Sequence, residues 1–396
     1  MKRISALLEH AKFYFGLLLM LGMAYIFTHY LDGDIGVVVW SFLLLAPIIS
    51  VLLSYRACRQ ITAKLEAPAY LAKGRHFTAS VTLTADGKLP VPFVRCRIRT
   101  DLNLVQDDAR AVQSAMTSEE PLSLPSSMTA RFAGCGEISI QELAVYDYLG
   151  WFKFPVKSLP SPVKVGVIPE IPSLSNAGIM LHTVSDIVLT QDEEEEETAS
   201  AFSAQSTPGY IHREYIPGDN LRRINWKMSA KRQKLMVRTD EASATVRPAV
   251  ILDLQPETTE TALQYRETML EGALGFLILL VRQGIPCSIR FASETVWKTL
   301  VLENEDDVRN AAVEIASADF VNDGNRIDIS TAHEKTAVCL IYTSRPDETL
   351  ASQASTLKDN GYVCAVSPAG ADAAALSGLD ALWTLSEDFT MQNLKK

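Results

Sequence analysis

Two apolar segments near the N-terminus constrain this chain more than any other feature of its sequence. Residues 11–31 are almost wholly apolar, and a second apolar run, residues 35–55, follows after only the short link Asp32-Gly33-Asp34. Each run has about 20 residues, which at about 1.5 Å per residue makes a helix long enough to cross the hydrocarbon core of a bilayer. The chain is therefore predicted to begin with a transmembrane helical hairpin, within residues 1–58.

The charges around this predicted hairpin indicate its orientation. The cations on its two outer flanks are Lys2, Arg3, Lys12, Arg56, Arg59 and Lys64. The link between the two apolar runs carries Asp32 and Asp34 and no cation. Because positively charged flanks stay on the cytoplasmic side, both termini are expected to be cytoplasmic. A cleaved signal peptide is the alternative for the first run, but a second apolar run follows at once and no small-residue cleavage site precedes it.

The next segment, residues 59–170, alternates apolar and polar residues with a period of two. ASVTLTA and FVRCRIRT are examples, and turn residues such as Asp86-Gly87 separate such stretches. Short alternating strands with frequent turns predict an antiparallel, β-sandwich-like domain.

Residues 171–246 are interpreted as a linker that contains two segments of opposite charge. Residues 192–197 are six consecutive carboxylates, which favour a solvated loop or, alternatively, a counter-charge for the basic segment that follows. That basic segment, residues 213–238, holds eight Arg and Lys residues against Glu214 and Asp219 only.

The basic segment allows a structural and a functional interpretation. In the first, its ions pair locally and Trp226 fills a core. In the second, the excess of cations forms a docking surface for a partner or an anion, since arginine binds carboxylate and phosphate in a two-pronged geometry. The net charge of the whole chain, −10, argues against a general nucleic-acid binder. Lipid headgroups remain a possible ligand.

The last segment, residues 247–396, alternates strand and helix patterns and is predicted to be an α/β domain. A continuous apolar strand ends at Asp253, and a helix is predicted over residues 261–283. Such alternation is typical of a parallel sheet covered on both faces. Asp253 then lies at the carboxyl end of the first strand, where sheets of this kind usually place their sites.

Sequence motifs of common enzymes are missing. The chain has no Walker A sequence, no G-x-S-x-G, no H-E-x-x-H and no G-x-G-x-x-G. Its six cysteines form no C-x-x-C pair, and Cys96, Cys339 and Cys364 lie in apolar runs where they are expected to be small buried hydrophobes. No enzymatic activity is therefore predicted.

The basic segment also carries a resemblance to a known family. Its pattern R-E-Y-x-P-G-D-x-x-R-x-I-x-W-K-x-S-A resembles the signature of the DUF58 family, bacterial membrane-associated proteins without an assigned activity. The candidate interaction residues taken from it are Arg213, Glu214, Tyr215, Gly218, Asp219, Arg222, Arg223, Asn225, Trp226, Lys227 and Ser229. Asn225 departs from the family, which usually has His there.

The resemblance implies a von Willebrand factor A-like domain at residues 247–396. In metal-binding members of that type the first strand ends in Asp-x-Ser-x-Ser, which holds Mg²⁺. Here Asp253 fits, but Gln255 and Glu257 replace the serines. No cofactor is therefore expected, and Asp253 and Glu257 are the only candidate Mg²⁺ ligands.

The resemblance also implies partners and a location. Proteins of this type often accompany MoxR-type AAA+ ATPases. The expected function is a multi-pass scaffold or adaptor in the bacterial inner membrane, without catalytic activity of its own. The alternatives are a divalent-cation-dependent binder or enzyme using Asp253, and a binder of lipid or nucleic acid through the basic segment.

Overall fold

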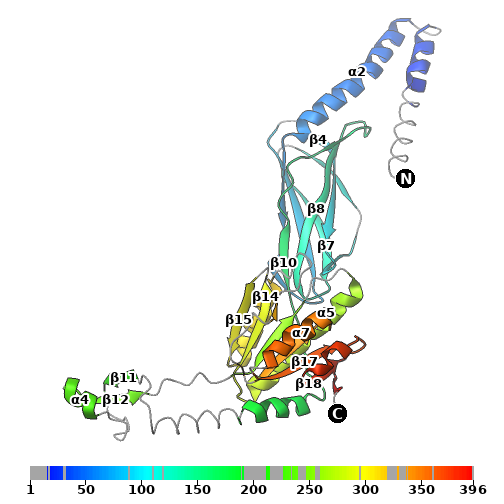
Figure 1. The fold of residues 1–396 in the computed structure, drawn as a ribbon. Helices are drawn as coiled ribbons and strands as arrows, with labels where there is room; N and C mark the ends of the chain where they lie inside the picture. Colours follow the sequence, from blue (N-terminus) through cyan, green and yellow to red (C-terminus); the bar gives the residue numbers. More distant parts are fainter. Residues whose placement is uncertain are drawn as a thin grey trace. The chain divides into compact units, whose positions relative to one another are not determined.

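The computed structural model divides the chain into two compact units, residues 1–168 and residues 169–396 (Figure 1). The residues it describes are 16, 18–29, 33–87, 90–108, 111–117, 120–188, 190, 211–214, 226–232, 234–239, 247–254, 259–293, 296–318, 328–329, 336, 338–358 and 361–394. The predicted mixture of an N-terminal apolar helix and several sheets is confirmed.

The first unit begins with two apolar helical segments, residues 18–29 and helix α2 (Gly33–Cys58). Among the described residues, α2 is the helix that is long and apolar enough to cross a membrane. The two segments lie close together, because a Cβ added at Gly36 would be 2.5 Å from the Cα of Thr28. Of the first predicted span, residues 11–31, positions 11–15, 17, 30 and 31 lie outside the described residues.

The predicted link between the two apolar runs is partly wrong. Gly33 and Asp34 belong to the first turn of α2 instead of to a loop. A carboxylate in a first turn is favoured by the partial positive charge of the helix N-terminus, which the prediction from hydropathy did not take into account.

Two sheets follow α2 in the same unit. One has the order β1-β3-β7-β5, and the other has the order β2-β10-β8-β4-β6 with β9 paired to β8. Their bounds are β1 (Ile61–Glu66), β2 (Tyr70–Ala72), β3 (His76–Ala85), β4 (Val91–Thr100), β5 (Leu104–Gln106), β6 (Val112–Met116), β7 (Leu122–Ala130), β8 (Gly134–Tyr146), β9 (Lys153–Pro155) and β10 (Val163–Ile168). All neighbours are antiparallel except β2 and β10.

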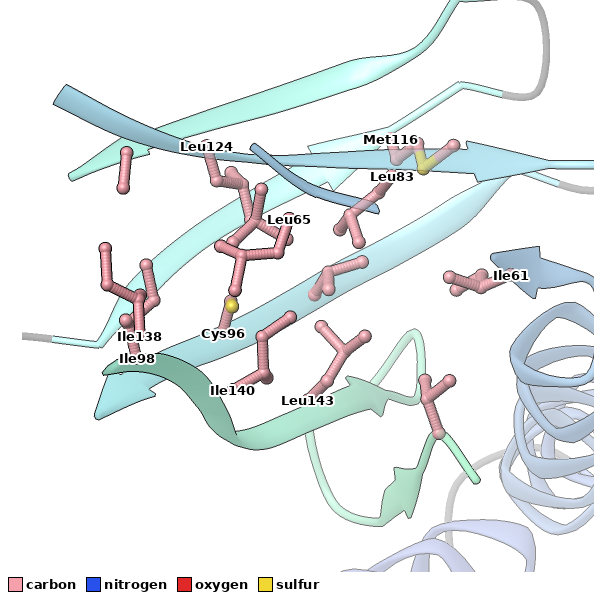
Figure 2. Close-up of a cluster of buried hydrophobic side chains, with 14 of the residues drawn as sticks. Ile61, Leu65, Leu83, Cys96, Ile98, Met116, Leu124, Ile138, Ile140 and Leu143 are labelled. Atoms are coloured by element: carbon pink, nitrogen blue, oxygen red, sulfur yellow. The ribbon is translucent and has the colours of Figure 1, made fainter. Parts of the chain in front are cut away.

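A single hydrophobic core lies between these two sheets (Figure 2). Leu83 and Leu124 enter it from the first sheet, while Cys96 and Ile140 enter it from the second. Alternate residues of each strand point inward because successive side chains of a strand point to opposite faces. The sheets with their shared core are called the β domain below.

The second unit contains a seven-stranded sheet with the order β15-β14-β13-β16-β17-β18-β19. Its strands are β13 (Ala249–Asp253), β14 (Cys287–Ser293), β15 (Val296–Leu302), β16 (Val338–Thr343), β17 (Tyr362–Pro368), β18 (Ala381–Leu385) and β19 (Met391–Asn393). The five central strands, β14, β13, β16, β17 and β18, are parallel to one another, and the edge strands β15 and β19 are antiparallel to their neighbours. The predicted parallel arrangement is therefore confirmed for the centre of the sheet.

Helices cover both faces of this sheet. Helices α5 (Glu260–Arg282) and α6 (Glu305–Ala316) contact each other, and α5 crosses the central strands. Helix α7 (Glu348–Leu357) and the 3₁₀ helix η4 (Ala374–Gly378) share a separate core with β16, β17 and β18 on the other face. A further helix at Gly178–Val188 precedes the sheet in the sequence.

A small element built from the basic segment belongs to the same unit. Strands β11 (Ile211–Glu214) and β12 (Met236–Thr239) pair antiparallel, with Arg213 opposite Val237. Helix α4 (Trp226–Arg232) lies between them in the sequence.

Candidate functional site

The carboxyl edge of the seven-stranded sheet is the first candidate site. From β13 the chain continues to β14 on one side, and from the neighbouring strand β16 it continues to β17 on the other, so the connections of these two strands run in opposite directions. Ligands of open α/β sheets bind at such a switch point, outside the carboxyl ends of the strands. Asp253 ends β13 and Thr343 ends β16, and the two residues are register partners.

Asp253 and Thr343 form a buried hydrogen-bonded pair. The Thr343 hydroxyl donates to Oδ2 of Asp253 at 2.7 Å, and both residues are almost completely buried. The same hydroxyl oxygen accepts a hydrogen bond from the backbone N–H of Arg345 at 3.1 Å. The only proton of the Thr343 hydroxyl is therefore used within the protein.

Two further hydroxyls lie beside this pair in the sequence. The hydroxyls of Tyr342 and Ser344 are buried and have no hydrogen-bond partner among the described residues. Burial raises the pKa of the Tyr342 phenol well above its usual value, so this group is neutral near pH 7. Buried polar groups without partners are rare in folded proteins and often mark a functional position.

The residues at this edge fit a divalent cation poorly. Carboxylate and hydroxyl oxygens suit Mg²⁺ in kind, but of the two predicted ligands the structure describes Asp253, whose Oδ2 already accepts the hydrogen bond from Thr343. Nowhere in the described part of the chain do three His, Cys, Asp or Glu side chains gather. Gln255 and Glu257 lie outside the described residues. The edge is therefore better explained as a site closed by its own hydrogen bonds.

The basic segment is the second candidate site, and the structure describes part of it. Of the predicted interaction residues, Arg213 and Glu214 lie in β11, and Trp226, Lys227 and Ser229 lie in α4. The others are outside the described residues: Tyr215, Gly218, Asp219, Arg222, Arg223 and Asn225.

Ser229 has a structural role in this element. It is buried, and its hydroxyl accepts a hydrogen bond from the backbone N–H of Met236 at 2.8 Å. Met236 begins β12 and is itself buried, so Ser229 holds α4 against that strand. The motif position therefore has a reason in the fold, independent of any partner.

Cations of the same helix remain accessible. Lys227, Lys231 and Arg232 of α4 are exposed. Lys227 and Lys231 are four residues apart and therefore lie on one side of the helix, where like charges repel unless an anion is near. The described half of the basic segment thus combines a fixed internal contact with an accessible cationic surface.

A third polar site, which the sequence did not reveal, joins α2 to the β domain. Asp147 is completely buried and accepts hydrogen bonds from the hydroxyl of Ser50 at 2.8 Å and from the backbone N–H of Phe152 at 2.7 Å. The backbone N–H groups of Leu149 and Trp151 also donate to it. Ser50 and Ser54, both buried, are polar residues one turn apart in an apolar helix, and this spacing was the available signal.

A family model described as "Protein of unknown function DUF58" matches residues 212–336. The match begins in β11 and covers the basic segment, β13, α5, β14, β15 and α6. It supports the DUF58 resemblance of the basic segment and extends it into the first half of the α/β domain.

Other comparisons give little. The search of curated proteins gave no match. A fragment of Escherichia coli alpha-2-macroglobulin is similar at 17% identity over 29% of this chain and 18% of its own length, with a TM-score of 0.25. A chain of the human zinc 2-glycoprotein–prolactin inducible protein complex is 13% identical over 26% of this chain and 89% of its own length, with a TM-score of 0.22. A Clostridium perfringens cohesin module is 11% identical over 27% of this chain and 96% of its own length, with a TM-score of 0.21. Similarities of this size indicate neither a shared fold nor a shared function.

Proposed function

We propose that this protein is a membrane-anchored scaffold without catalytic activity of its own, which presents a cytoplasmic α/β domain to protein partners. Helix α2 carries the proposal. Its side chains between Ile35 and Ile49 are largely exposed and apolar, although the helix is joined firmly to a folded domain. So large an exposed apolar surface is stable in lipid and costly in water.

The helical segment at residues 18–29 supports a second span. It is apolar, exposes large side chains such as Leu18, Met23 and Ile26, and touches α2 at Gly36. Arg56 and Arg59 lie at the end of α2 that meets the β domain, which favours a cytoplasmic β domain and cytoplasmic termini in the bacterial inner membrane.

The state of the sheet edge supports a scaffold over an enzyme. The carboxylate of Asp253 is buried and engaged by Thr343, and is therefore poorly placed to act on a substrate. In this proposal the partner is a MoxR-type AAA+ ATPase, which hydrolyses the ATP. The DUF58 match and a mostly parallel sheet with helices on both faces support assigning a von Willebrand A-like domain to residues 247–396.

Crosslinked affinity purification from membranes tests the docking part of this proposal. We expect the wild type to recover an AAA+ ATPase, and Arg222→Glu/Arg223→Glu to recover at least about tenfold less, because charge reversal opposes electrostatic docking. Arg75→Glu/Arg99→Glu makes the same charge change on the β domain and should behave as wild type. If the folded motif variant recovers the same partners, the docking role is wrong.

A cation-dependent binder or enzyme using Asp253 is the second candidate, because the unpartnered Ser344 hydroxyl lies at the same sheet edge. It requires that titrating the full chain with Mg²⁺ or Mn²⁺ releases or absorbs heat, and that Asp253→Asn abolishes the signal. The absence of heat with either ion would exclude it. Turnover of a small molecule by the purified wild type, lost in Asp253→Asn, would instead replace the scaffold proposal.

A further inference from the structure

A groove of about 390 Å³ opens where the last turn of α2 meets the β domain. Its volume falls within the range of about 300–1,000 Å³ that is usual for small-molecule sites. The lining residues that matter here come from α2, the turn after it, β1, and β9 with the residues that follow: Tyr55, Arg59, Ile61, Phe154, Val156 and Lys157.

One part of the groove is apolar. Ile61 and Val156 are buried within it, and the rings of Tyr55 and Phe154 meet edge to face with their centres 6.0 Å apart. The aromatic pair joins α2 to β9, so this wall is built from both elements and does not depend on a flexible loop.

The other part is cationic. Arg59 and Lys157 are exposed, and none of the described residues that line the groove is acidic. The Arg59 guanidinium donates to the Tyr55 hydroxyl at 2.5 Å and lies over the Tyr55 ring, 4.7 Å from its centre. This contact fixes the guanidinium while leaving most of its five N–H donors for a ligand.

The position of the groove along α2 sets its depth. Tyr55 follows Asp34 by 21 residues, which corresponds to about 32 Å of helix, close to the thickness of about 30 Å of a hydrocarbon core. Only two residues separate the end of α2 from β1, and Ser50 donates to Asp147, so the β domain keeps one position along the helix. With α2 crossing the bilayer, the groove therefore opens at the level of the lipid headgroups of the cytoplasmic leaflet, which is rich in anionic lipids.

We propose that this groove binds an anionic glycerophospholipid, with its phosphate on Arg59 and Lys157 and its glycerol and upper acyl chain against Tyr55 and Phe154. The inference rests on the proposed membrane anchoring. It is independent of the basic segment, whose residues take no part in it.

Native mass spectrometry of the full chain, released from detergent micelles with added lipid, tests the inference. We expect the wild type to retain phosphatidylglycerol in preference to phosphatidylcholine. Arg59→Gln/Lys157→Gln should lose that preference, by about fivefold for each cation removed. Ser158 also lines the groove, so Ser158→Trp keeps both cations while placing a large side chain in the groove, and it should lose both lipids. Arg75→Gln/Arg99→Gln removes two cations elsewhere on the β domain and should retain the preference.

Two results would overturn the inference. One is equal retention of both lipids by the wild type, and the other is an unchanged preference in Arg59→Gln/Lys157→Gln. Alkaline carbonate extraction of membranes from cells that produce the full chain separates this failure from failure of the anchoring. A chain that stays in the membrane without a lipid preference refutes only the groove, whereas a chain that is extracted refutes the anchoring and the groove together.

Discussion

At the scale of single residues, Asp147 explains how a polar contact can hold an apolar helix. Its carboxylate is withdrawn from water, which is costly unless hydrogen bonds compensate. Charge-assisted bonds from the Ser50 hydroxyl and from backbone N–H groups supply that compensation. The turn that aims these N–H groups passes through Gly150 at φ 73°, where glycine avoids the strain of a side chain. The carboxylate of Asp147 thus stabilises the turn that follows it and also binds α2 through Ser50.

Asp147→Ala should destabilise the β domain by about 3 kcal/mol, because it leaves buried donors without an acceptor. Ser50→Ala removes one donor and should cost about 1 kcal/mol. Thermal unfolding of the detergent-solubilised full chain, followed by circular dichroism, measures both. Ser123→Ala, at an exposed position of β7, should leave the transition unchanged. Equal stability of the Asp147 and Ser50 variants would contradict this account.

The burial of individual residues was predictable from the sequence, while the hydrogen-bond partners of the buried carboxylates were not. Cys96, Cys339 and Cys364 are buried as predicted, and burial raises the pKa of Cys96 to about 11 and that of Cys339 to about 12. Local alternation decides such burial. By contrast, the hydroxyls that donate to Asp147 and Asp253 come from residues 97 and 90 positions away in the sequence, and no local pattern encodes these two contacts.

At the scale of elements, α5 shows how close packing selects glycine inside a helix. A Cβ at Gly275 would lie 2.7 Å from the carbonyl oxygen of Pro172, and one at Gly272 would meet the side chain of Leu385. The segment at Pro172 is held there by a hydrogen bond from the backbone N–H of Glu170 to Oε1 of Glu271. Glycine within a helix costs about 1 kcal/mol relative to alanine, and here the close approach requires it.

Gly275→Ala should destabilise the α/β domain by about 1–3 kcal/mol, because a backbone carbonyl cannot rotate away from the new methyl group. Gly178→Ala is the matched control. A Cβ at Gly178 meets nothing within 4 Å, so this substitution should be neutral or slightly stabilising. Urea unfolding of both variants compares them, and a Gly275 variant as stable as the control would refute the close approach.

Element boundaries were predicted well where caps mark them. The helix predicted over residues 261–283 is α5, Glu260–Arg282, which is capped by Thr259 and followed by Gly284 at φ 75°. The start of α2 was predicted too late in the sequence, because Gly33 and Asp34 belong to its first turn and not to a loop. Helices α7 and η4 share one core with β16, β17 and β18. This packing depends on contacts between segments far apart in the sequence, so the periodicity within either helix could not predict it.

At the scale of the whole molecule, α2 has two parts with different surroundings. The helix has 26 residues, about 39 Å, which is longer than a hydrocarbon core of about 30 Å. Its first part exposes apolar side chains, whereas Ser54, Ala57 and Cys58 near its end are buried. Hydropathy predicted a span over residues 35–55 but could not reveal that the last turns belong to the interface with the β domain.

The topology of the chain gives a prediction at this scale. A reporter that is active only in the cytoplasm should function when fused after Lys396, and one that requires export should function when inserted after Leu31. The flanking cations, which stay inside, are the reason. Assays of whole cells carrying each fusion measure this. Periplasmic activity of the C-terminal fusion would refute the orientation.

The MoxR and von Willebrand A-like assignments remain predictions, since the DUF58 match covers residues 212–336 alone.

The bond between Ser50 and Asp147 also has a mechanical consequence. A helix joined to a domain through its last turns acts as a lever arm. Where the apolar length of a helix exceeds the local bilayer thickness, the helix tilts. A tilt of α2 would therefore rotate the β domain by the same angle. The orientation of the β domain relative to the membrane would in this way depend on the thickness of the bilayer.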